Sequence, residues 1–97
     1  MSPDGFRDTL TGAAPPETLT PELKALWFCA QGQWTEAHRM VQSIDSPAAA
    51  WVHAHLHREE GDLSNAAYWY RRAGRSVQSG SLRDEWQSIL DALLGGT

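Results

Sequence analysis

The stretch from Trp51 to Gly74 constrains the fold of this chain more than any other part of it. It reads WVHAHLHREEGDLSNAAYWYRRAG and holds two apolar patterns of helical period on either side of a Gly-Asp break. Gly61 can end the first helix and Asp62 can cap the second. The stretch therefore predicts a helical hairpin with a tight turn at residues 61–62.

The same unit recurs earlier in the chain. Sliding the sequence until Gly32 lies over Gly61 also places Val41 over Tyr70, so the chain contains two related helix pairs. A single pair of this kind cannot bury its apolar face alone, and neighbouring pairs must stack to form a core. The repeat predicts stacked antiparallel hairpins.

Start signals divide the rest of the sequence into helices. Thr20 before Pro21 and Ser46 before Pro47 are typical of a capping residue followed by proline in the first helical turn, and Ser81 with Asp84 resembles a capping box. We expect helices over about residues 21–31, 33–44, 47–60, 63–73 and 82–94. The prediction is an all-α fold of about five helices, in which the last one is a C-terminal capping helix.

The first 19 residues differ from the rest in composition. Prolines, glycines and acids interrupt them, and no helical period is sustained. We expect residues 1–19 to form a poorly ordered N-terminal arm and residues 20–97 to form the helical-repeat domain. Phe6 and Leu10 are spaced to anchor the arm, conceivably as a single helical turn.

Charge and cysteine content exclude several classes of protein. The net charge is -4, which argues against a nucleic-acid partner. Cys29 is the only cysteine, so no disulfide within the chain is possible. The N-terminus lacks the pattern of a signal peptide, and no apolar run is long enough for a bilayer. We expect a cytoplasmic protein that binds no membrane.

The second helix of the repeat carries a family resemblance. The pattern that runs through Gly61, Leu63, Ala66, Tyr70 and Ala73 resembles the signature of tetratricopeptide and Sel1-like repeats, and Gly32 to Val41 resembles a weaker copy. The span from Leu23 to Gly74 is also similar to a group of short bacterial proteins of uncharacterised function. The resemblance implies tetratricopeptide-like hairpins and brings no activity with it.

The helix at residues 47–60 offers the best candidate contact surface. Its apolar stripe predicts that His55 and Leu56 are buried, whereas the tetratricopeptide register would bury His57 instead. The stripe leaves His53 and His57 facing outward or into a shared groove. With neighbours on the next helix, the candidate partner-binding surface comprises Ala50, His53, Ala54, His57, Arg58, Asn65, Tyr68 and Arg72.

The histidines also raise the possibility of a metal site. His53 and His57 are one helical turn apart, a spacing at which a helix can offer two imidazoles to one ion, and His38 lies one helix earlier. No third ligand is evident from the sequence, and no glutamate follows His53 as a metalloprotease helix requires. A polar helix face, or a set of histidines hydrogen-bonded at an interface, is the favoured interpretation, so no metal ligand and no cofactor is predicted.

No other group of residues forms a recognisable catalytic set. The five tryptophans lie at stripe positions and are expected in the core, and Cys29 has no evident base beside it. We therefore expect a non-enzymatic protein-protein interaction module that binds another protein or itself, with a homodimer possible. The alternative is a small metal- or ligand-binding protein, conceivably an enzyme, that uses His53 and His57.

Overall fold

The structure, a computed structural model, describes residues 1–95, and over that range it consists of helices without a strand. The helices are α1 (Pro3–Thr9), α2 (Pro21–Ala30), α3 (Trp34–Val41), α4 (Pro47–Glu59), α5 (Leu63–Ala73) and α6 (Leu82–Leu93). The predicted all-α fold is confirmed, with six helices in this range instead of about five. In the described range, none of them combines the length and the apolar character that a bilayer span requires.

Capping side chains fix most of the helix starts. In α2, α4, α5 and α6 the residue before the helix accepts a hydrogen bond from the backbone amide three residues later, and these caps are Thr20, Ser46, Asp62 and Ser81. Gly74 ends α5 with a φ of 72°, a left-handed conformation that glycine adopts without steric cost. These signals are readable in the sequence, so the predicted bounds of α2, α4, α5 and α6 agree closely with the observed ones, whereas α3 ends at Val41, earlier than predicted.

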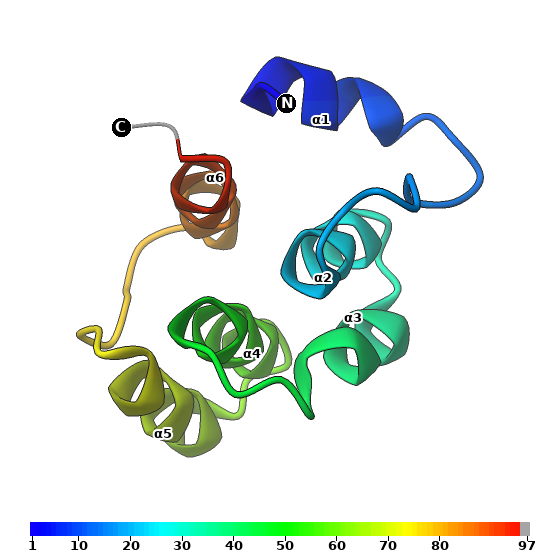
Figure 1. Cartoon of the computed structure of the whole chain (residues 1–97). Helices are drawn as coiled ribbons and strands as arrows, with labels where there is room; N and C mark the ends of the chain where they lie inside the picture. The colour runs from blue at the N-terminus through cyan, green and yellow to red at the C-terminus, as the bar shows by residue number, and fades with distance from the viewer. Residues whose placement is uncertain (96–97) are drawn as a thin grey trace.

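The helices form three layers (Figure 1). Helices α2 and α4 lie in the middle, α3 and α5 lie on one side of them, and α6 and α1 lie on the other. Tight turns at Gly32 and Gly61 reverse the chain, so that α3 packs on α2 and α5 packs on α4. Helix α6 packs against both α2 and α4 and so covers the side of the two pairs that faces away from α3 and α5.

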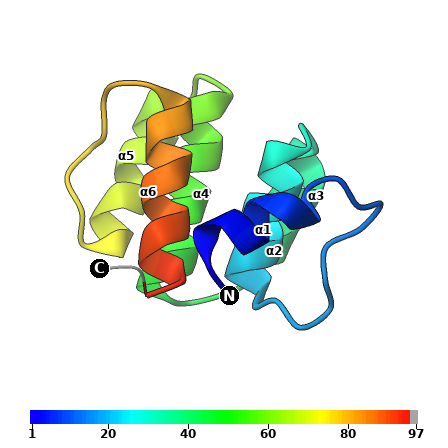
Figure 2. The same ribbon diagram turned by 90° about the horizontal axis from the view of Figure 1, so that it is seen from above.

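The N-terminal segment differs from its prediction. Residues that were expected to form a poorly ordered arm include helix α1, and Phe6 within it has no exposed surface. Seen from above, α1 lies over α2 and its first turn comes next to α6 (Figure 2). The anchoring role suggested for Phe6 and Leu10 fits this placement, since Phe6 is part of the core and Leu10 packs against it.

Helix α4 is the centre of the molecule. It packs against α2, α3, α5 and α6, and every residue from Ala49 to His57 is buried. A helix with neighbours on all sides has no solvated face, whatever its apolar stripe suggests. This arrangement decides where most of the predicted site residues lie.

Candidate functional sites

The predicted partner-binding surface is divided by the fold. Ala50, His53, Ala54 and His57 are all buried, with at most 6% of any of them exposed. The side chain of Arg58 is 11% exposed and is held inside a polar network. Of the two placements expected for His53 and His57, outward or into a shared groove, the outward one is wrong, because α3 and α5 cover the face of α4 that the helical stripe left free.

The rest of that surface remains accessible on α5. Tyr68 is 43% exposed, Arg72 is exposed and Asn65 is half-buried, and their spacing places them on one side of the helix. The guanidinium of Arg72 donates a hydrogen bond to the hydroxyl of Tyr68 at 3.1 Å and lies 5.1 Å from the ring centre of Trp69. We call Asn65, Tyr68, Arg71 and Arg72 the α5 outer face.

A histidine cluster, formed by His38, His53 and His57, lies between α3 and α4. The ring centres of His38 and His53 are 4.6 Å apart, and those of His53 and His57 are 4.8 Å apart. One ring nitrogen from each residue lies within 4.8 Å of those of the other two. The structure thus supplies the third imidazole that could not be placed from the sequence.

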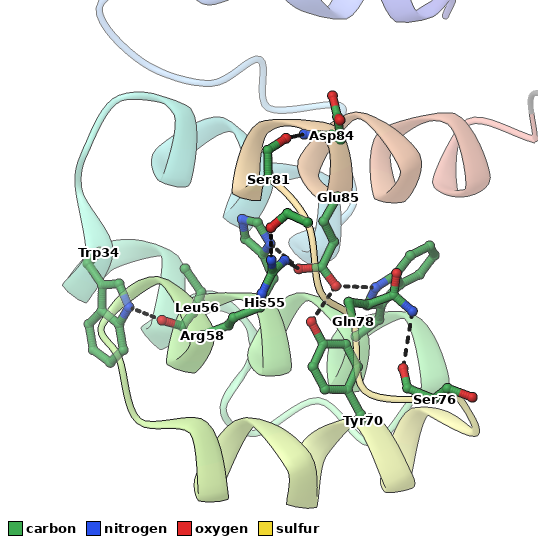
Figure 3. A network of polar contacts seen from close by, with 12 residues as sticks. Trp34, His55, Leu56, Arg58, Tyr70, Ser76, Gln78, Ser81, Asp84 and Glu85 are labelled. Carbon is green, nitrogen blue, oxygen red and sulfur yellow. Dashed lines mark hydrogen bonds and ion pairs between the residues drawn. The ribbon is translucent and has the colours of Figure 1, made fainter.

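Two tryptophans enclose the histidine cluster. Trp34 stacks on His38 with ring centres 4.8 Å apart, and Trp69 stacks on His53 at 3.8 Å. The indole of Trp34 is itself fixed, because its N–H donates a hydrogen bond of 2.7 Å to the carbonyl of Leu56 (Figure 3). The cluster therefore has flat, apolar walls that restrict how its rings can turn.

Two of the three imidazoles, those of His38 and His53, have a lowered pKa. Burial, together with the neighbouring His38 and His57, lowers the pKa of His53 to about 3. Burial also lowers the pKa of His38, with a smaller contribution from His57. His57 Nδ1 lies 2.7 Å from a carboxylate oxygen of Glu60, so Nε2 is the ring nitrogen of His57 that does not face this carboxylate.

A second polar network centres on Glu85 of α6 (Figure 3). This carboxylate is only 4% exposed and accepts hydrogen bonds from His55 Nδ1 at 2.7 Å, Arg58 at 3.0 Å, Trp51 Nε1 at 3.2 Å and the hydroxyl of Tyr70. Burial raises the pKa of Glu85, but hydrogen bonds from His55 and Tyr70 and the charge of His55 outweigh that effect, so the pKa falls to about 2. The network joins α4, α5 and α6.

Cys29 has the environment of a structural cysteine. It lines a cleft of about 250 Å³ with His55, Glu59 and Trp86. Burial, together with the nearby carboxylate of Glu59, raises the pKa of its thiol to about 12. The thiolate, which is the nucleophilic form, is therefore scarce at neutral pH, and His55 already uses its Nδ1 to bind Glu85.

Comparison with protein-family models, with curated proteins and with solved structures finds no match for this chain. The resemblance to tetratricopeptide and Sel1-like repeats therefore stays a prediction from the sequence.

Glu85 could not be identified as a site residue from the sequence. It is a lone glutamate among the apolar residues of α6, and such a position gives no signal of burial. The one hint in the sequence is indirect. His55 and Trp51 were expected to be buried, and each has a ring N–H that needs a buried hydrogen-bond acceptor.

Proposed function

We propose that the protein is a non-enzymatic, cytoplasmic interaction module that binds another protein through the α5 outer face. The observation that carries the proposal is the arrangement of Tyr68 and Arg72, which are exposed and already hydrogen-bonded to each other. Tyrosine and arginine are enriched among residues that dominate binding energy, because they combine contact area with directed hydrogen bonds.

The position of α6 favours the α5 outer face as the binding surface, because α6 covers the opposite side of the two helix pairs. Trp86 of α6 donates a hydrogen bond of 3.0 Å to the carbonyl of Leu26 in α2, and Glu85 binds side chains of α4. The side of α2 and α4 that faces away from α3 and α5 is therefore filled by the chain itself. A partner meets α5 without displacing any helix.

Charge indicates what kind of partner fits. Arg71 and Arg72 are exposed on α5, and the only ion pair that either makes in the described residues is the 3.3 Å contact of Arg72 with Asp45, a side chain that is itself 94% exposed. Such a pair is weak in water and exchanges readily for another carboxylate. We expect the partner to present acidic side chains, and a second copy of this chain, with a net charge of -4, meets that description.

The test compares a double variant with a matched control. Tyr68→Ala with Arg72→Ala removes the ordered pair from the α5 outer face, whereas Arg39→Ala removes an exposed arginine of α3 that pairs with Glu36 of its own helix. Light scattering measures self-association, and affinity purification followed by measurement of Kd with each recovered protein measures other partners. We expect binding to weaken at least about tenfold in the double variant and to be unchanged in Arg39→Ala.

Two outcomes would contradict the proposal. One is a wild-type chain that is strictly monomeric and recovers no partner. The other is a partner that binds the double variant as tightly as it binds the wild type.

A further inference from the structure

We propose that His38, His53 and His57 form a binding site for a transition-metal ion of the Zn²⁺ type, with a fourth coordination position left for water or another ligand. The alternative interpretation of the sequence used His53 and His57, with His38 as a further candidate, and the fold brings all three together. Three histidines with an open position are a recurring ligand set for zinc in proteins.

The geometry is close to what an ion requires. Zinc binds imidazole nitrogen at about 2.0–2.1 Å, so the nitrogens of a tetrahedral site are about 3.4 Å apart. The cluster already holds one nitrogen of each ring within 4.8 Å of the others. His53 and His57 are one turn apart on the same helix, so a rotation of their side chains that brings the ring nitrogens to about 3.4 Å from one another would complete the site.

An independent observation points to a ligand at the same place. His53 is 4% exposed, and its Nδ1 is the one buried side-chain nitrogen or oxygen in the described part of the chain that has no hydrogen-bond partner. Buried polar atoms in proteins are nearly always paired, so each exception calls for an explanation. A metal ion among the three rings would give the buried imidazole the partner that the protein does not supply.

The carboxylate of Glu60 contacts one of the three proposed ligands, His57, and orients its ring. Its contact of 2.7 Å with His57 Nδ1 fixes the ring and leaves Nε2 for the ion, an arrangement that raises the basicity of metal-bound histidines. The stacked rings of Trp34 and Trp69 hold His38 and His53 in place from the two sides. The ion would thereby connect α3 to α4.

The donors also define which metals fit. Imidazole nitrogens suit Zn²⁺, Co²⁺, Ni²⁺ and Cu²⁺, whereas Mg²⁺ and Ca²⁺ require oxygen ligands. A competing group of donors, composed of His57, Glu60 and Asp62, lies at the exposed end of α4 and offers two carboxylates. The two candidate sites can be distinguished by substitution, because the histidine cluster requires His38 to bind the ion and the competing group requires Asp62.

The experiment uses protein without a histidine tag and measures Zn²⁺ binding by calorimetry and by elemental analysis. We expect one Zn²⁺ per chain, no binding of Mg²⁺, and a higher Tm with Zn²⁺ than with a chelator. Co²⁺ in place of Zn²⁺ should give the visible absorption of a tetrahedral ion. His38→Gln should weaken Zn²⁺ binding at least about 100-fold, and Glu60→Gln should weaken it about 10-fold to 100-fold.

Asp62→Asn is the matched control, because asparagine caps a helix as well as aspartate does and removes only the carboxylate. We expect its Zn²⁺ affinity to equal that of the wild type. Circular dichroism establishes that each variant is folded, and Glu60→Gln, whose side chain is 38% exposed, keeps the test valid if His38→Gln does not fold. The proposal is overturned if folded wild-type protein binds neither Zn²⁺ nor Co²⁺, if His38→Gln or Glu60→Gln binds like the wild type, or if Asp62→Asn loses the ion.

Discussion

At the scale of single residues, Glu85 shows how a charged group becomes part of a core. A buried carboxylate without partners is costly, but this one accepts hydrogen bonds from four side chains of α4 and α5. Two of the donors, His55 and Arg58, can also carry positive charge. Glu85 therefore orients α6 in a way that an apolar side chain of the same size could not.

We predict that Glu85→Gln lowers the free energy of unfolding at pH 7 by about 3 kcal/mol. The folded-state pKa of Glu85, about 2, lies below the ordinary value of 4.5, so its charge stabilises the fold fully above pH 4.5. That contribution is lost as the pH falls from 4.5 towards 2. Urea denaturation at several pH values should show the difference between wild type and variant shrinking across this window.

Glu59→Gln is the control for the pH series. Glu59 is an exposed carboxylate at the C-terminal end of α4. Its substitution should leave the free energy of unfolding within about 0.5 kcal/mol of the wild type at each pH. A Glu85→Gln protein as stable as the wild type at pH 7 would contradict the role given to the buried carboxylate.

At the scale of elements, α1 shows a limit of local sequence patterns. A helix of seven residues is unstable by itself in water. It is held here by the core contact of Phe6, whose ring centre is 6.0 Å from that of Trp86, and by the carbonyl of Thr9, which accepts a hydrogen bond of 3.2 Å from Trp27. Because these partners lie far away in the sequence, local periodicity does not predict the helix.

We predict that Phe6→Ala lowers the free energy of unfolding by about 3–5 kcal/mol, because it removes a fully buried aromatic ring. Hydrogen exchange of the α1 amides should speed up in this variant more than exchange in α4. Asp8→Ala, on the exposed side of the same helix, should change stability by no more than about 0.5 kcal/mol. Unchanged exchange in α1 would mean that Phe6 does not hold the helix.

At the scale of the whole molecule, the packing around α4 separates what could be predicted from what could not. The caps at Thr20 and Ser81 act within a few residues, so the helix bounds could be read from the sequence. The burial of His53 and His57 depends on α3 and α5 closing over α4 from outside the helix. A stripe on one helix identifies one neighbour, and α4 has four.

The same packing predicts that α6 and α1, the two outer helices on one side of the molecule, contribute unequally to the stability of the fold. Removing residues 79–97 takes away α6, with the fully buried Ile89 and Leu90, and leaves the donors of His55 and Tyr70 without an acceptor. Each buried aliphatic side chain contributes about 2–5 kcal/mol, against a total stability of about 5–15 kcal/mol for a domain. We expect the shortened chain to show no cooperative urea transition by circular dichroism.

Removing residues 1–13 instead takes away α1, whose only fully buried side chain is Phe6. This chain should keep a cooperative transition at a lower urea midpoint, since the network around Glu85 and the contacts of α6 with α2 and α4 stay intact. A synthetic peptide of residues 79–95 should restore helicity to the chain that lacks α6, and the same peptide with Glu85→Gln should restore less. If the chain without α6 unfolds as cooperatively as the full protein, then α6 is an accessory helix and the two hairpins alone make the fold.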